Sequence, residues 1–210
     1  MNLKRVLAIT LVLGIIAHGF IFWSKKPYIK NADSTGSNII AFGDSLVYGV
    51  GSTPGNDMFS LTGKALGVTI INKGVPGDTT RDGLMRFDND VVNNNPRIVF
   101  ILLGGNDYLQ KVPEEETFKN LETMIQNAQG AGAAVILLGV RGGVFVDKFA
   151  EHYKALAQKY DCLYVPNVLE GIVLNRDLMY DSIHPNDKGY KIVAVRLEAA
   201  LKEVIDAGQI

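Results

Sequence analysis

The stretch Asn38-Ile-Ile-Ala-Phe-Gly-Asp-Ser-Leu46 decides the fold, because an apolar run stops at a glycine and two polar residues follow at once. A short run rich in Ile, Val and Leu, without polar alternation, is typical of a parallel β-strand that is buried on both faces. Three more such runs and a weaker fifth one follow: Val68–Ile71, Ile98–Leu103, Val135–Val140 and Cys162–Val165. The sequence therefore predicts a parallel sheet of about five strands.

Helical patterns lie between these runs. Glu114–Gln129 carries one apolar stripe and begins with three glutamates, which suit the positive end of a helix dipole. Val146–Lys159 and Lys188–Asp206 also show apolar residues at helical spacing. The alternation of strands and helices predicts an α/β fold with right-handed crossovers and helices on both faces of the sheet.

The chain of 210 residues is long enough for one domain and an appendage. We expect the domain over residues 38–210, a flexible linker over the mostly polar residues 31–37, and a separate N-terminal segment over residues 1–30. The single cysteine, Cys162, rules out an intramolecular disulfide. No group of cysteines and histidines has zinc spacing, so we expect neither a metal nor a cofactor.

Charge is distributed unevenly along the chain. Residues 1–30 hold five basic residues and no acid, which leaves 16 basic against 22 acidic residues, a net charge of −6, over residues 31–210. An acidic body without a basic stripe argues against nucleic acid as a partner. We expect a monomer that acts on a small molecule or a lipid.

The N-terminal segment has the length and polarity of a membrane anchor. Val6–Trp23 contains no charge, and its eighteen residues would span about 27 Å as a helix, close to the ~30 Å hydrocarbon core of a bilayer. We expect residues 6–23 to anchor the chain, with the domain on the periplasmic or another extracytoplasmic side. The alternative is a cleaved secretory signal, with Ala17-His-Gly19 as a poor cleavage site, and a secreted domain.

Four polar blocks together contain the groups that acyl transfer needs. They are Gly43–Leu46, Gly77–Thr79, Gly104–Asp107 and Asp181–Pro185. The first three follow apolar runs, and the fourth lies in the loop before the last helical pattern. Because sites in open α/β sheets form at the carboxyl ends of the strands, we expect the four blocks to converge on that edge.

Elimination singles out His184 as the base. A serine hydroxyl is a weak nucleophile until a base removes its proton, and histidine can do this near neutral pH. Of the three histidines, His18 lies in the apolar N-terminal run and His152 in an amphipathic helical pattern. His184 alone lies in a loop, three residues after Asp181, which could hold its imidazole in one tautomer. Ser45 is the candidate nucleophile, although a serine after a strand is also a common helix N-cap.

Gly77 and Asn106 are candidate donors to an oxyanion, through a backbone N–H and a side-chain amide. The simplest alternative for both is a turn residue. Asp44, Asp78 and Asp107 flank these donors. We expect all three carboxylates to make local hydrogen bonds in their loops rather than to act in catalysis or bind a metal.

The residues after the fourth apolar run are candidate substrate contacts. Val140–Phe145 should border the site, and we single out Arg141, Gly142 and Val144. Apolar members of this run could line an acyl groove, and Arg141 could meet a phosphate or a carboxylate. The alternative for Arg141 is an ordinary solvated side chain.

The four blocks, in this order and spacing, resemble the SGNH or GDSL-type hydrolases, and within them the bacterial thioesterase, lysophospholipase and arylesterase branch. The resemblance covers nearly all of residues 38–205. It implies a three-layer α/β/α, flavodoxin-like sandwich and catalysis without a cofactor. Pro76 departs from the branch, which tends to have serine there, and it should stiffen the turn that precedes Gly77.

The resemblance also implies a role for each site residue. Ser45 would be the nucleophile, His184 the general base and then acid, and Asp181 its orienting partner. The N–H groups of Ser45 and Gly77 and the side-chain amide of Asn106 would form the oxyanion hole.

We therefore expect a serine hydrolase that cleaves carboxylic esters or thioesters of acyl chains through an acyl-enzyme. A carbohydrate or cell-wall O-deacetylase on the same fold is the alternative. A non-catalytic, membrane-tethered binding module is more remote, because a binder has no need of the whole set. A flavodoxin-type nucleotide binder ranks last, because no Gly-x-Gly-x-x-Gly run or phosphate loop follows the first strand.

Overall fold

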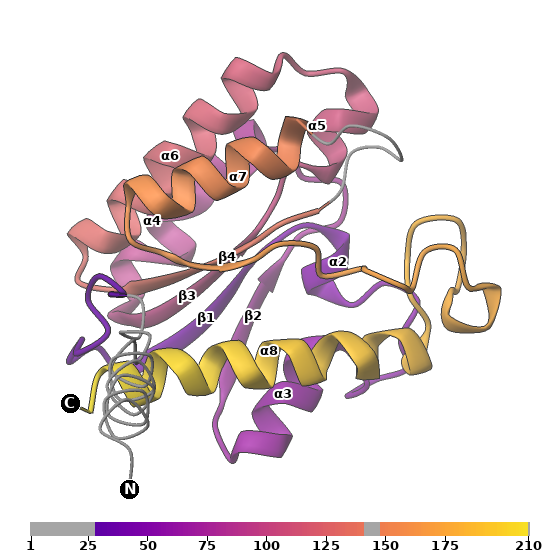
Figure 1. Cartoon of the computed structure of the whole chain (residues 1–210), viewed down its shortest axis with the longest axis horizontal. Coiled ribbons are helices and arrows are strands. Elements are labelled where there is room, and N and C mark those ends of the chain that lie inside the picture. The colour runs from indigo at the N-terminus through magenta and orange to yellow at the C-terminus, as the bar shows by residue number, and fades with distance from the viewer. Residues whose placement is uncertain (1–27, 141–147, 210) are drawn as a thin grey trace, which may run out of the picture.

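The structure is a computed structural model that describes residues 28–140 and 148–209. Its centre is a five-stranded, fully parallel sheet with the strand order β2-β1-β3-β4-β5. The expected α/β fold is thus confirmed, as is a sheet of about five strands (Figure 1). The strands are β1 (Asn38–Gly43), β2 (Ile70–Gly74), β3 (Pro96–Leu102), β4 (Ala134–Leu138) and β5 (Leu163–Val165).

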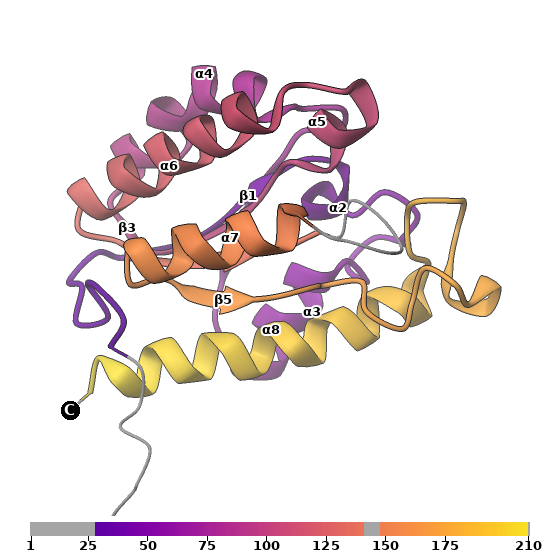
Figure 2. The ribbon, with the colours of Figure 1, turned by 45° about the horizontal axis from the view of Figure 1, so that its top comes forward.

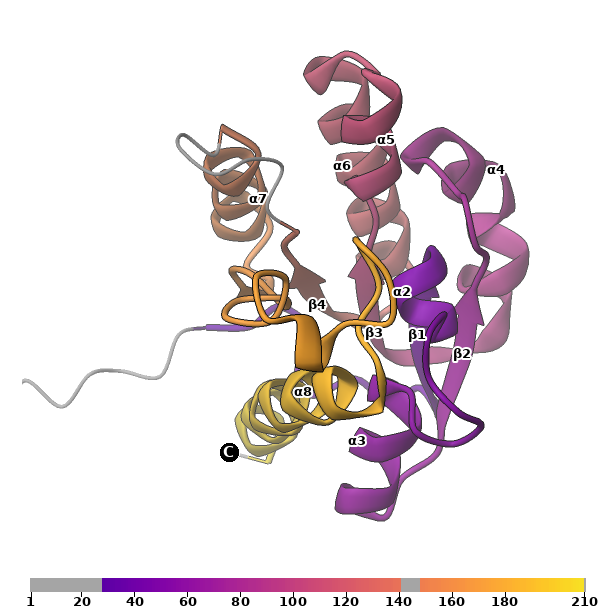
Figure 3. The same ribbon diagram turned by 90° about the vertical axis from the view of Figure 1, so that its right-hand side faces the viewer.

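Helices cover both faces of the sheet and make three layers, which are clearest end-on in Figure 3. One face packs against α3 (Met58–Leu66) and α8 (Asp187–Ala207). The other face packs against α4 (Thr80–Asp90), α6 (Glu114–Gly130) and α7 (Lys148–Lys159). The short helices α2 (Ser45–Tyr48) and α5 (Gly105–Gln110) directly follow β1 and β3, and two 3₁₀ turns span Val92–Asn94 and Arg176–Leu178.

Burial on both faces explains why the strands show no polar alternation. In β1, Ile39 and Ala41 belong to the core on the α3 and α8 side, whereas Ile40 and Phe42 belong to the core on the α4, α6 and α7 side. Every one of these side chains is buried. Burying a side chain of this size stabilises the fold by roughly 1.5–3 kcal/mol, so each apolar run contributes to both cores.

The residues at and just before the start of the segment expected as a flexible linker, 31–37, contact the body of the domain. Ile29 is only 4% exposed and belongs to the core on the α3 and α8 side of the sheet. The Asn31 side chain donates hydrogen bonds to the carbonyls of Gln129 and Ala133, and Lys30 N–H donates to the Asp161 carbonyl. The Asn31 side chain thus ties the chain to the end of α6 and to the residue just before β4.

Some residues singled out from the sequence lie outside the described ranges. These are the N-terminal apolar run and three of the candidate substrate contacts, Arg141, Gly142 and Val144. Within residues 28–140 and 148–209, no helix is long and apolar enough to cross a bilayer.

Candidate active site

Ser45 is placed by the tight end of β1. A Cβ on Gly43 would lie 2.1 Å from the Leu102 carbonyl oxygen, so only glycine lets β1 and β3 approach this closely before the chain turns. Asp44 then caps α2, with its side chain accepting a hydrogen bond from Leu46 N–H at 2.9 Å. Ser45 is the first residue of α2, which sets it at the carboxyl edge of the sheet.

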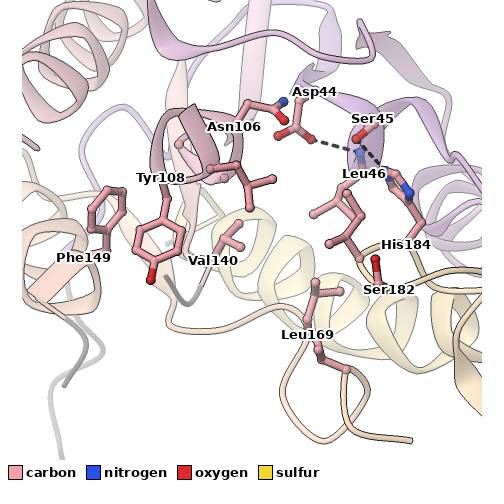
Figure 4. Close-up of a pocket in the computed structure, with 15 residues that line it drawn as sticks. Asp44, Ser45, Leu46, Asn106, Tyr108, Val140, Phe149, Leu169, Ser182 and His184 are labelled. Atoms are coloured by element: carbon pink, nitrogen blue, oxygen red, sulfur yellow. Dashed lines mark hydrogen bonds between the residues drawn. The ribbon is translucent and has the colours of Figure 1, made fainter. Parts of the chain in front are cut away.

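The structure joins Ser45, His184 and Asp181 in one chain of hydrogen bonds. His184 Nε2 lies 2.9 Å from Ser45 Oγ, and His184 Nδ1 lies 2.8 Å from Asp181 Oδ2. Figure 4 shows the bond between the serine and the histidine at one end of the pocket. With the ring proton on Nδ1, Nε2 is free to accept the serine proton, which is the geometry that general-base activation requires.

The loop that carries His184 is folded by its own hydrogen bonds. Asp181 Oδ1 accepts from the N–H groups of Ile183 and His184, both at 2.8 Å, and Tyr180 N–H donates to the His184 carbonyl. Partial burial tends to raise the pKa of Asp181, but the bonds from His184 and Ile183 outweigh it and lower the pKa to about 2. This carboxylate therefore stays ionised and holds the imidazole through neutral pH.

Gly77 lies in a tight turn that the preceding proline shapes. Asp78 N–H donates to the Val75 carbonyl, Pro76 occupies the second position, and Gly77 has a φ of +91° in the third. These are features of a type II turn, where proline supplies the first central φ and glycine the positive one. Pro76 thus fits the turn, which follows β2 next to the start of α4.

Asn106 connects this turn to the pocket. Asn106 lies two residues after Gly104, which precedes α5 and has a φ of +113°. The side-chain nitrogen of Asn106 donates to the Asp78 carbonyl at 2.9 Å. A primary amide has two hydrogens, so this bond fixes the side chain and leaves one hydrogen for another acceptor. Asn106 also lines the same pocket as Ser45 and His184.

The three aspartates beside these donors differ from one another. Asp44 makes the expected local bond, but Asp107 does not, because it is fully buried and accepts from the backbone and hydroxyl of Thr80 and from the Thr117 hydroxyl. Asp78 pairs with Arg86 at 2.7 Å. The expectation of local loop bonding is therefore wrong for Asp107, which joins α5 to α4 and α6, and for Asp78, whose carboxylate pairs with a side chain on α4.

Asp44 is the most perturbed carboxyl in the site. It is 3% exposed, and burial raises its pKa to about 7, although the Leu46 N–H bond and the charge on His184 favour the ionised form. Among the described residues, no group of three His, Cys, Asp or Glu side chains is arranged to hold a metal ion.

A pocket of about 190 Å³ extends from the pair Ser45 and His184, and most of its lining is apolar. Sequence reasoning missed Tyr108, Phe149 and Leu169 as lining residues. Tyr108 directly follows the third polar block, and that position was the only sequence signal. The lining residues are Asp44, Ser45, Leu46, Gly104, Gly105, Asn106, Tyr108, Leu109, Val140, Phe149, Leu169, Val173, Ser182, Ile183 and His184.

His152 lies away from this site, as the sequence analysis expected. Its side chain is half-exposed on α7, and its ring packs on Phe118 with centroids 4.7 Å apart.

Comparison with known families identifies the chain. Residues 41–192 match the GDSL-like Lipase/Acylhydrolase family. The chain belongs to this family. Its relatives include Esterase TesA from Pseudomonas aeruginosa, 31% identical over 70% of this chain and 79% of that protein. An arylesterase from Vibrio mimicus is 30% identical over 79% of this chain and 88% of its own length.

Solved structures agree with this assignment. The crystal structure of TesA superimposes with a TM-score of 0.75 at 28% sequence identity, covering 80% of this chain and 99% of that one. As a GDSL-type hydrolase, the chain belongs to a family of enzymes that hydrolyse esters, and the resemblance drawn from the four polar blocks is confirmed.

Proposed function

We propose that this GDSL-type hydrolase cleaves carboxylic esters and thioesters of acyl chains through an acyl-enzyme on Ser45. The observation that carries the proposal is the unbroken hydrogen-bonded chain from Ser45 Oγ through His184 to Asp181. An apolar pocket opens beside this chain and is suited to the acyl part of a substrate.

Acylation starts when Ser45 Oγ attacks the acyl carbonyl carbon while His184 Nε2 takes the hydroxyl proton. The carbonyl π-electrons move to oxygen and give a tetrahedral oxyanion. When the carbonyl re-forms, the bond to the alcohol or thiol breaks, and His184 returns its proton to that leaving group. Asp181 stabilises the imidazolium between these two steps.

Deacylation repeats the sequence with water as the nucleophile. His184 takes a proton from water as its oxygen attacks the acyl carbon, and the collapsing intermediate expels Ser45 Oγ, which recovers a proton from His184. The products are a carboxylic acid and the regenerated enzyme.

The oxyanion would be held by three donors: the N–H groups of Ser45 and Gly77 and the free amide hydrogen of Asn106. The bond from Asn106 to the Asp78 carbonyl supports this role, because it ties the amide to the residue after Gly77. Donors that are fixed before the reaction stabilise developing charge at little reorganisation cost.

A burst experiment tests the proposal. The full chain is mixed with p-nitrophenyl butyrate, and we expect a stoichiometric burst of p-nitrophenol followed by a slower steady rate. Ser45→Ala should give neither phase, whereas the His152→Ala control should match the wild type. Hydrolysis that persists in Ser45→Ala would overturn the proposal.

A carbohydrate O-deacetylase remains the second candidate on this site. The two differ in the acyl group, since a deacetylase gains nothing from an apolar pocket beyond the first carbon. Activity confined to acetyl esters would favour the deacetylase. A folded chain that is inert on acetyl and longer esters alike would favour a binding module.

We also propose that residues 6–23 anchor the chain in a membrane and that the active site faces away from it. In support, Ala32 lies against Gly208 and Lys30 against Asp161, so the described chain begins at the amino end of the sheet (Figures 1 and 2). Ser45 lies at the other end of β1, a strand that spans about 20 Å. Substrate would then arrive from the aqueous side.

Membrane fractionation of the full chain tests the anchor. We expect the protein to resist an alkaline carbonate wash and to keep its N-terminal residues by intact mass. A soluble protein whose mass shows cleavage near Gly19 would support the secreted alternative instead.

A further inference from the structure

The pocket has a polar end and an aromatic end. Figure 4 shows Ser45 and His184 on one side and Tyr108 and Phe149 on the other, with Val140 and Leu169 between them. An acyl chain whose carbonyl carbon lies at Ser45 has this apolar stretch available to it. The aromatic pair is the far wall that such a chain meets.

The wall has one fixed member and one exposed member. Phe149 is 5% exposed, and its ring packs edge-on against Phe118 with centroids 5.2 Å apart. Phe118 in turn packs against Tyr153, whose hydroxyl donates to the Leu103 carbonyl at the end of β3. Phe149 is therefore held by the core of the domain.

Tyr108 forms the other member and lies two residues after Asn106 on α5. Its ring meets Phe149 edge-on, with centroids 5.6 Å apart at 86°, yet the residue is 47% exposed. A residue this exposed can be truncated with little effect on the core, so its ring serves the pocket more than the fold.

The size of the pocket sets a scale for the substrate. A dry cavity of about 150 Å³ takes one benzene molecule, so about 190 Å³ has room for an acyl group of roughly six carbons. A longer chain has to pass or displace the aromatic wall.

We propose that Tyr108, held edge-on by Phe149, sets the upper limit of acyl-chain length and makes this chain an esterase for short acyl groups. This inference rests on the proposed ester hydrolysis at Ser45. The wall acts by exclusion: its rings occupy the space that the seventh and later carbons need, and they leave the carbonyl end of the pocket untouched.

The test compares kcat/KM for p-nitrophenyl esters from acetate to palmitate in the full chain and three variants. Tyr108→Ala opens the wall, Tyr108→Phe keeps the ring, and Tyr28→Ala removes an exposed tyrosine at the opposite end of the sheet. Thermal unfolding of each variant verifies the fold.

We expect the wild-type kcat/KM to fall beyond hexanoate. In Tyr108→Ala the ratio of decanoate to acetate should rise at least tenfold, mainly through a lower KM for decanoate, since each methylene newly buried contributes about fourfold. Tyr108→Phe and Tyr28→Ala should keep the wild-type ratio.

A wild type that hydrolyses esters but whose length preference is the same in Tyr108→Ala would overturn this inference and leave the proposed function standing. Equal wild-type activity from butyrate to palmitate would overturn it in the same way. A wild type that hydrolyses no ester would overturn both.

Discussion

Two segments meet at the bond between Ser45 and His184, and they are built in opposite ways. Gly43–Leu46 lies at the end of the buried strand β1. The close packing of β1 against β3 fixes the direction of the backbone there. Asp181–Pro185 has no helix or strand, is largely exposed, and is shaped by bonds to the Asp181 carboxylate and to the His184 carbonyl. Ser45 is thus positioned by core packing and His184 by local hydrogen bonds.

The same contrast appears in the charges of the two segments. Asp44 loses its water on burial and has a pKa raised to about 7, whereas the side chain of Asp181 is 42% exposed and its hydrogen bonds lower the pKa to about 2. When two environments shift the pKa values of two carboxyl groups in opposite directions, the two groups are suited to different roles. Asp181 is kept charged beside His184, and Asp44 is close to neutral beside Ser45.

The largest expected effect comes from breaking the contact between the two segments. His184→Ala should lower kcat on the order of 10⁶-fold, about as much as Ser45→Ala, and the double variant should be no worse, because the pair acts as a unit. Steady-state kinetics on one ester give all three values. Losses that multiply in the double variant would show that the two residues act separately.

Removing only the carboxylate that shapes the exposed loop should have a smaller effect. Asp181→Asn should lower kcat on the order of 10⁴-fold, because the amide presents the wrong group to His184 Nδ1. Asp177→Asn, an exposed change in the 3₁₀ turn just before this loop, is the matched control and should leave kcat unchanged. A loss below tenfold in Asp181→Asn would mean that packing rather than this carboxylate orients the histidine.

At the carboxyl ends of the strands, Asn106→Ala removes one proposed oxyanion donor. We expect kcat to fall roughly 10²–10³-fold with little change in KM, since the bond forms mainly in the transition state. The variant also loses the bond to the Asp78 carbonyl, so its Tm should be measured alongside. A fall that appears only in KM would argue against the oxyanion role.

The smallest effect concerns stability and separates the two acids by pH. The pKa of Asp44 is raised on folding. Its contribution to the free energy of unfolding is therefore fully present below pH ~4 and is lost as the pH rises through about 7. Asp181 has a lowered pKa, and its contribution is lost only as the pH falls toward 2. Asp44→Asn should therefore raise the free energy of unfolding at pH 8, on the order of 1–3 kcal/mol, and change it little at pH 4. Denaturant unfolding at both pH values measures this, and equal shifts at both would contradict the assigned cause.

Sequence predicted the parts of the molecule that packing controls. The strands could be predicted because a strand buried on both faces needs an apolar run such as Ile98–Leu103. The polar blocks could be located because most of them lie where such runs stop. The resemblance to GDSL-type hydrolases added the role of each block. His184 needed no structure to be found, since the other two histidines lie in unsuitable places.

The rest depended on contacts between distant residues. Asp107 was expected to bond within its loop, but its partner Thr80 lies on α4. The bonds from the Asn31 side chain to the Gln129 and Ala133 carbonyls join residues about 100 positions apart. The aromatic wall is formed by Tyr108 on α5 and Phe149 on α7. No local sequence pattern shows that these two residues meet.

Core packing and a hydrogen-bonded loop would together activate one hydroxyl, that of Ser45. Labelling with a fluorophosphonate probe, followed by peptide mapping, tests it most directly. We predict a single adduct on Ser45 in the wild type and in His152→Ala, and labelling that is slowed at least a hundredfold in His184→Ala. An adduct on Ser182, which lines the same pocket, or labelling that does not depend on His184, would contradict the account.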